Sequence, residues 1–166
     1  MIQDIMHRTF LGNSIEAYAW FFIIALAGIL FKRLLSKSLA YLGYKLIRKH
    51  ASPVGYAKFN ALVEKPIGIF ILLITFYLAF DRLEFPNGWN LVPVERFGLR
   101  MILFSGFQIA IIFSLSWTFL RLIDFFGLIL MHKASLTESK ADDQLVSFIK
   151  EALKVVVIIL SVFFIL

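Results

Sequence analysis

The sequence predicts an all-α integral membrane protein with about four transmembrane helices and its N-terminus outside. Hydrophobic residues make up 60% of the 166 residues and charged residues only 17%, whereas soluble chains average roughly 45–50% and about 25%. Long uncharged stretches recur along the chain, and the basic residues are distributed unevenly between them. This composition disfavours a soluble enzyme and excludes disorder. The absence of cysteine excludes disulfides and thiolate sites.

The first two predicted spans lie in the N-terminal half of the chain. The first covers approximately residues 15–35, and basic residues follow its uncharged stretch. The second covers approximately residues 66–83 and begins with Pro66, which suits a first helical turn because the N–H group has no partner there. A basic cytoplasmic loop, 36–65, is expected between them. Leucines recur every three or four residues over 32–50, so this part is expected to continue the first helix.

The other two predicted spans cover approximately residues 101–121 and 148–166. The third span contains an uncharged stretch of the length that a bilayer requires, about 20 residues. A polar cytoplasmic loop, 132–147, separates it from the fourth span, which is still apolar at Leu166. We therefore expect the sequence to be an N-terminal fragment, with a short C-terminal span as the alternative. All spans are assigned to one transmembrane helical domain, 1–166.

The distribution of Lys and Arg predicts the orientation. Of the 17 basic residues, one lies in 1–16, eight in 32–65, three in 81–100 and five in 121–154. Cytoplasmic loops carry the excess of Lys and Arg, so the second and fourth of these segments are expected inside. This location also disfavours nucleic-acid binding. We expect headgroup and topology anchors at Lys32, Arg33, Lys37, Arg48 and Lys49. Whether this segment only carries topology charges or also senses lipid or tension stays open.

Few polar residues fall within the predicted spans. Gly106, Ala110 and Ser114 are spaced four apart, which predicts a face for close helix packing. Gln108 is expected to form an interhelical hydrogen bond, and Asp124 a salt bridge or a solvated contact rather than a proton relay. No motif for catalysis, a cofactor or a metal is recognisable, so we expect none of these activities or ligands.

The C-terminal stretch carries a family resemblance. An acidic pair, Asp142-Asp143, leads into a helix with Gln144-Leu145-Val146, Ile149-Lys150 and Leu153-Lys154-Val155. This pattern resembles the segment that precedes the pore helix in small-conductance mechanosensitive (MscS-like) channels. The N-terminal FLGNSIEAYAWFFIIAL also resembles the start of family members with additional N-terminal helices.

The resemblance implies a tension-sensing and membrane-anchoring part of a channel of the bacterial inner membrane. Such channels are homo-oligomers, usually heptamers, and protect cells against hypo-osmotic shock. The family's functional residues lie mostly in the pore helix and vestibule, which would follow Leu166, so none is carried over and this chain alone is not expected to conduct. One alternative is a small non-pore subunit or assembly partner of a larger membrane complex. Another is a transporter or membrane enzyme.

Overall fold

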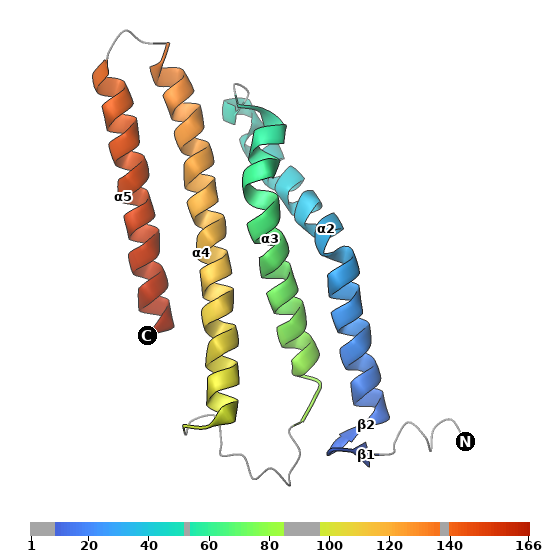
Figure 1. The fold of residues 1–166 in the computed structure, drawn as a ribbon. Helices are drawn as coiled ribbons and strands as arrows, with labels where there is room; N and C mark the ends of the chain where they lie inside the picture. The colour runs from blue at the N-terminus through green and yellow to red at the C-terminus, as the bar shows by residue number, and fades with distance from the viewer. Residues whose placement is uncertain (1–8, 52–53, 85–96, 137–139) are drawn as a thin grey trace. The chain divides into compact units, whose positions relative to one another are not determined.

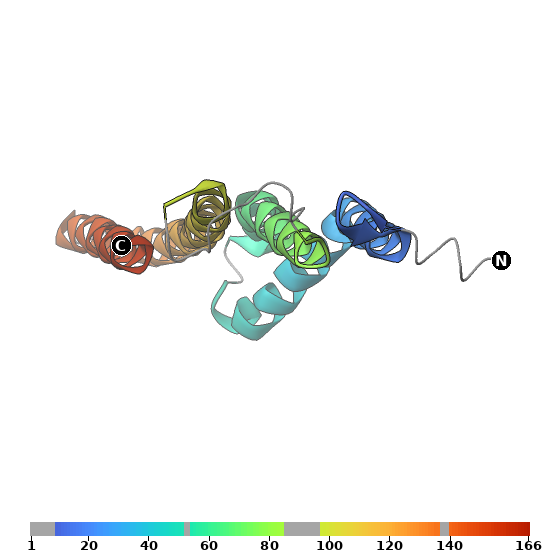
Figure 2. The same ribbon diagram turned by 90° about the horizontal axis from the view of Figure 1, so that it is seen from below.

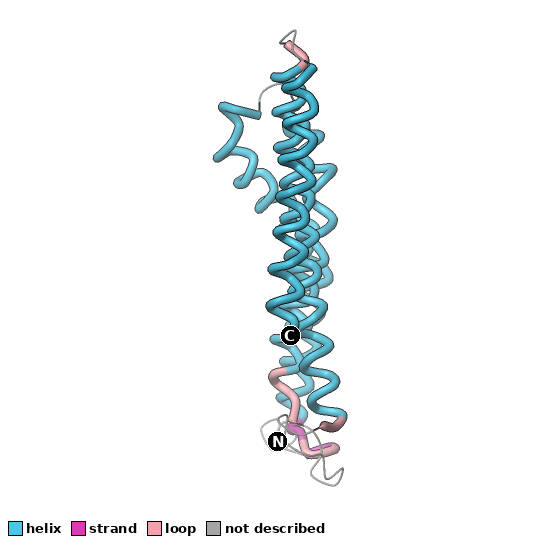
Figure 3. Tube along the Cα trace, turned by 90° about the vertical axis from the view of Figure 1, so that its left-hand side faces the viewer, coloured by secondary structure: helices cyan, strands magenta, loops and turns pink. Residues whose placement is uncertain are grey.

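The computed structural model describes residues 9–51, 54–84, 97–136 and 140–166 (Figure 1). In this part of the chain, helices account for almost all residues, and the only strands form a small hairpin (Figure 3). The elements are β1 (Thr9–Phe10), β2 (Asn13–Ser14), α2 (Ile15–Ala51), α3 (Gly55–Phe80), α4 (Leu99–Ala134) and α5 (Lys140–Ile165). The predicted all-helical class is thus confirmed for the described residues.

Three of the helices have the length and apolarity needed to cross a membrane. They are the 15–49 part of α2, all of α3 and all of α4. α3 contains 26 residues, which at about 1.5 Å per residue exceeds a hydrocarbon core of about 30 Å. α5 is also long, but Lys150, Glu151 and Lys154 lie in its first half. A fourth span through α5 therefore stays a prediction.

The predicted basic loop 36–65 is wrong as a loop, because almost all of it is helical. α2 continues to Ala51 and α3 begins at Gly55. Gly55 has a positive φ of 77°, a conformation that glycine adopts readily. The predicted continuation of the first helix through 32–50 is confirmed. The leucine-rich pattern therefore determines the local structure here, and the charges do not interrupt the helix.

The predicted polar loop 132–147 is also much shorter in the structure. α4 ends at Ala134 and α5 begins at Lys140, so the polar residues at both ends belong to helices. Asp142 and Asp143 consequently lie in the first turn of α5 rather than before it. A helix can extend into water beyond the bilayer, so charge did not mark the helix ends.

Pro66 lies in the interior of α3, which corrects its expected place in a first turn. α3 starts at Gly55 because the following turns also carry core residues, Phe59 and Val63, one helical turn apart. Pro66 has no N–H group for a bond to the carbonyl of Leu62. Its side chain is fully buried, so the helix continues through a packed site.

Close contacts divide the chain into two compact units, each described separately. Unit 1 comprises 1–32 and 71–111, and unit 2 comprises 33–70 and 112–166. Each of α2, α3 and α4 therefore contributes one portion to each unit. The assignment of 1–166 to a single transmembrane domain stays a prediction.

Unit 2 contains a small hydrophobic core. It is centred on Phe59 and Phe125, whose ring centroids lie 4.8 Å apart in an edge-to-face arrangement. Ala40, Val63 and Ile129 complete the buried cluster. Here α3 contacts both α2 and α4, and α4 also lies beside α5 (Figures 1 and 2). Neighbouring helices in this unit are thus consecutive in the sequence.

In unit 1 the N-terminal hairpin is attached to the end of α3. The Asn13 side chain accepts a hydrogen bond from the Glu84 N–H and donates one to the Glu84 carbonyl, both at 2.6 Å. Asn13 is buried, and this pairing satisfies its amide. α2 and α3 approach closely at Gly28, where the side chain of Thr75 occupies the space beside the glycine. These contacts organise the start of α2 and the end of α3.

Candidate functional site

The pair formed by α4 and α5 in unit 2 contains a network of ion pairs. The carboxylate of Asp124 in α4 forms an ion pair with Lys154 of α5, whose Nζ lies 2.8 Å away. It also accepts a hydrogen bond of 3.3 Å from Arg121. The side chains of Asp124 and Lys154 are each 23% exposed. Of the two contacts expected for Asp124, a salt bridge or a solvated contact, the structure shows the salt bridge, and its interhelical partner is Lys154.

The network continues along α5. Glu151 lies 3.3 Å from Lys154 and 3.5 Å from Lys150. Glu151 is mostly exposed, so its ion pairs contribute little stability, about 0–1 kcal/mol each. The Asp124–Lys154 contact is the more consequential one, because it joins two helices and both partners are largely covered.

A close approach of the backbone lies beside this network. Gly127 of α4 is buried, and a Cβ at this position would lie 2.7 Å from Cδ of Lys150. The aliphatic stem of Lys150 thus lies over the glycine while its amino group reaches Glu151. Long basic side chains commonly combine an apolar contact with an exposed charge in this way.

A serine pair forms the other end of the α4–α5 contact. The hydroxyls of Ser116 and Ser161 are hydrogen-bonded to each other across the helices. Each hydroxyl also lies within hydrogen-bond distance of the carbonyl four residues earlier, that of Ile112 or Val157. Because each has one proton, one serine donates to the other while the second donates to its own helix. Serine hydroxyls commonly form such hydrogen bonds between helices in lipid.

Helices α4 and α5 run antiparallel, and three contacts define their register. Position 116 faces 161, position 124 faces 154 and position 127 faces 150. The contact therefore extends over about three helical turns, or about 16 Å. Over this length α4 and α5 are joined by a hydrogen bond, an ion pair and a lysine stem.

The expected headgroup anchors all lie on α2. Arg33, Lys37, Arg48 and Lys49 are exposed and Lys32 is half-buried. In the part of the chain that the structure describes, no ion pair to an acidic side chain involves them. Their positions leave the charged groups accessible to a ligand, and their anchoring role stays a prediction.

The residues predicted for helix packing differ in their surroundings. Ser114 is buried, Ala110 is half-buried, and Gly106 and Gln108 are exposed. Among the described residues, no other atom lies within 4 Å of the position that a Cβ at Gly106 would take, apart from the neighbouring backbone of its own helix. The close approaches lie instead at Gly28 and Gly127, which the sequence analysis missed. For Gly28 the available signal was a series of small residues on α2, namely Ala25, Gly28, Ser36, Ala40 and Gly43.

Comparison with known proteins adds no assignment. No family model matches the chain, and no curated protein or solved structure matches it significantly. Within the described residues, no three His, Asp or Glu side chains gather to hold a metal ion. Function is therefore inferred from the helices, their charges and the resemblance of the C-terminal stretch.

Proposed function

We propose that the chain is a multi-pass protein of the bacterial inner membrane whose helices form the lipid-facing, tension-sensing part of a mechanosensitive channel. One observation carries the membrane part of this proposal. Large apolar side chains are exposed along all four helices, including Phe22 at 65%, Phe113 at 66% and Phe163 at 73%. Soluble monomers rarely expose apolar surface on this scale, whereas lipid tails favour it.

The proposed orientation places the N-terminus outside. α2 then runs inward, α3 outward, α4 inward and α5 outward as the fourth span. The 32–65 segment, with eight basic residues, lies on the cytoplasmic side. Pairing with Asp124 lowers the cost of placing Lys154 near the membrane, because charged groups in spans require partners or access to water.

Tension sensing requires two states that differ in the area they occupy in the membrane, since tension favours the larger one. The α4–α5 contact is suited to such a change. It is made by a few polar contacts, while the apolar side chains of the second half of α5 remain exposed. Interhelical hydrogen bonds in lipid contribute only about 0.6–2 kcal/mol each. We therefore propose that tension separates α5 from α4.

Disulfide cross-linking tests this separation directly, because the chain has no native cysteine. The variant Ser116→Cys/Ser161→Cys reports the α4–α5 contact in proteoliposomes. The control is Ser36→Cys/Gly68→Cys across α2 and α3, where a Cβ at Gly68 would lie 3.8 Å from Cβ of Ser36. This distance suits a disulfide. Osmotic swelling is expected to slow oxidation of the first pair and leave the control unchanged. Equal rates with and without swelling for the first pair would refute the proposal, as would equal slowing of both.

Accessibility of single cysteines tests the orientation. Ser38→Cys lies on α2 within the segment expected inside, and Phe97→Cys lies just before α4, on the side expected outside. Both native side chains are exposed. In intact cells a membrane-impermeant maleimide is expected to label the second variant only. Labelling of Ser38→Cys alone would indicate the opposite orientation. Labelling of both variants would contradict a membrane barrier between the two positions.

The non-pore subunit remains the second candidate, and the surroundings of Gly106 leave room for the partner that it needs. An exposed glycine with no neighbour within 4 Å leaves space for a helix of another chain. Purification of the tagged chain in mild detergent distinguishes the two. Self-assembly alone supports the channel part, whereas stoichiometric recovery of a different membrane protein supports the subunit.

A further inference from the structure

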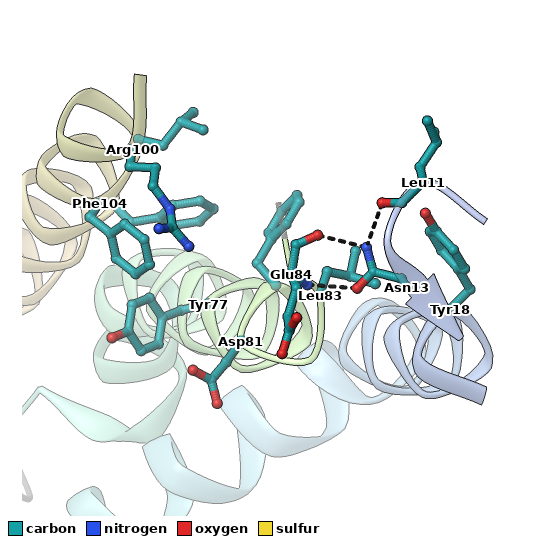
Figure 4. A pocket seen from close by; sticks show the side chains of 12 residues that line it. Leu11, Asn13, Tyr18, Tyr77, Asp81, Leu83, Glu84, Arg100 and Phe104 are labelled. Atoms are coloured by element: carbon teal, nitrogen blue, oxygen red, sulfur yellow. Dashed lines mark hydrogen bonds between the residues drawn. The ribbon is translucent and has the colours of Figure 1, made fainter. Parts of the chain in front are cut away.

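Unit 1 contains a partly enclosed cavity of about 440 Å³. It lies between the N-terminal hairpin, the start of α2, the end of α3 and the start of α4 (Figure 4). Cavities of about 300–1,000 Å³ are the usual size for small-molecule sites. All residues that line it belong to unit 1, so the cavity is formed within one compact body.

The wall of this cavity is largely apolar and aromatic. Phe80 and Phe107 lie with ring centroids 5.7 Å apart, and Tyr77 lies 6.4 Å from Phe107. Phe104 and Leu103 extend this wall along α4. These rings provide a surface for a hydrocarbon chain, because aromatic side chains bury large apolar areas.

Charged groups of both signs border the apolar wall. Arg100 at the start of α4 supplies a guanidinium, and Asp81 and Glu84 after α3 supply two carboxylates (Figure 4). In the described part of the chain, neither carboxylate forms an ion pair or accepts a side-chain hydrogen bond. Glu84 is nevertheless held in place, because its backbone is bound to Asn13 by two hydrogen bonds.

We infer that this cavity binds a zwitterionic phospholipid. Arg100 binds the phosphate, Asp81 and Glu84 bind the ammonium group, and the aromatic wall holds part of an acyl chain. A guanidinium has five donors and suits phosphate oxygens, so it accommodates the phosphate in addition to contacts within the chain. The carboxylates disfavour other headgroups: they repel a purely anionic lipid, and an uncharged lipid offers them no ammonium group.

The position of the cavity agrees with this ligand. It lies where the apolar parts of α3 and α4 end, and charged residues begin at Asp81 and Arg100. A phospholipid changes from hydrocarbon to headgroup at the same level of a membrane. The inference rests on the membrane insertion proposed above, and it requires neither tension sensing nor a particular orientation.

Native mass spectrometry of the intact chain in detergent tests the site. Phosphatidylethanolamine and phosphatidylglycerol with identical acyl chains are titrated in parallel. We expect phosphatidylethanolamine to bind about tenfold more tightly, since one charge-assisted contact is worth about that factor. Arg100→Gln should weaken this binding about tenfold. The double variant Asp81→Asn/Glu84→Gln should remove the preference between the two lipids.

Two variants serve as matched controls. Arg82→Gln removes a neighbouring exposed cation and Glu16→Gln an exposed carboxylate, and neither side chain lines the cavity. Both should bind phosphatidylethanolamine as the unmodified chain does. Circular dichroism establishes that every variant retains its helices.

Equal binding of the two lipids by the unmodified chain would overturn the inference, as would equal losses in Arg100→Gln and Arg82→Gln. If Arg100→Gln fails to fold, the comparison of lipids and the carboxylate double variant decide. The measurement is made without tension, so its failure leaves the proposed tension sensor standing. Failure of the cross-linking test, in turn, leaves the lipid site standing.

Discussion

Gly28→Ala provides a sharp test of the packing between α2 and α3. A Cβ at this position would overlap Cγ2 of Thr75 and lie 2.7 Å from its Cβ. The Thr75 side chain cannot easily rotate away, because its hydroxyl donates a hydrogen bond of 2.8 Å to the carbonyl of Ile71 and β-branched residues are restricted in a helix. Rotation cannot relieve the contact with Cβ of Thr75, because this atom is attached to the backbone, so the two helices would have to move apart. The substitution should therefore destabilise unit 1.

The expected change in the unfolding free energy of Gly28→Ala is the sum of two opposing contributions. Overpacking a close contact costs about 1–3 kcal/mol. Alanine in place of glycine stabilises a helix interior by about 1 kcal/mol. Since the clash at Gly28 involves a carbon attached to the backbone, the cost lies in the upper part of its range, and we expect a net loss of about 1–2 kcal/mol. Gly106→Ala is the matched control on α4. Its Cβ would meet nothing within 4 Å in the part of the chain that the structure describes, so it should gain about 1 kcal/mol.

The assay is equilibrium unfolding in mixed micelles of mild detergent and dodecyl sulfate, followed by circular dichroism. Both variants replace glycine by alanine within a predicted span, so their difference in unfolding free energy, about 2–3 kcal/mol, isolates the contact with Thr75. The double variant Gly28→Ala/Thr75→Ala should recover part of the loss, because it removes Cγ2 but keeps Cβ. A Gly28→Ala protein as stable as Gly106→Ala would refute the close approach of α2 and α3.

Three further predictions concern unit 2 and the basic residues. Phe125→Ala should cost about 3–5 kcal/mol of unfolding free energy in the same assay, because Phe125 is fully buried, whereas exposed Phe113→Ala should change it little. Lys154→Gln should slow oxidation of the Ser116→Cys/Ser161→Cys pair in the cross-linking assay, because it leaves Asp124 without its interhelical partner. Adding Asp124→Asn should restore part of the contact, and an equal effect of single and double variants would contradict the pairing. The last prediction concerns four basic residues of α2, Lys32, Arg33, Arg48 and Lys49. Replacing all four by glutamine should change the orientation of the chain or, in a channel that contains this chain, the tension threshold in patch recordings. If both stayed unchanged, the anchoring role of these residues would be refuted.

The sequence is sufficient to predict the helices but not their ends. Uncharged stretches identify α3 and α4 because a helix in lipid must be apolar over its full depth. The ends differ from the prediction because the charged residues over 36–65 and 132–147 lie mostly in helices rather than in loops. Helices that protrude into water can carry charge on exposed positions, and the periodic leucines over 32–50 were the more accurate signal. Lys58 and Lys65 likewise occupy exposed positions of α3 before Pro66, so the helix begins well before the proline.

For the α4–α5 contact, the sequence predicts that Asp124 interacts with a partner or with water, but it does not identify the partner. Asp124 lies close to the apolar third span, and a carboxylate there requires a partner or access to water, so the sequence predicts a salt bridge or a solvated contact. The identity of the partner depends on the antiparallel register of the two helices. Nothing in the sequence specifies whether Lys150 or Lys154 faces Asp124, because both lie on α5 one turn apart. The structure places Lys154 on Asp124 and lays the stem of Lys150 over Gly127.

Small residues raise the same question of register. Gly106 belongs to a regular series of small residues on α4, yet it has no close neighbour, whereas Gly28 is filled by Thr75. A glycine indicates that a close approach is possible, and the facing side chain decides whether it occurs. The stability of Gly106→Ala therefore carries functional information. A gain agrees with a face that meets only lipid, and a loss in the assembled protein identifies this face as the contact with another helix, as either proposed assembly requires.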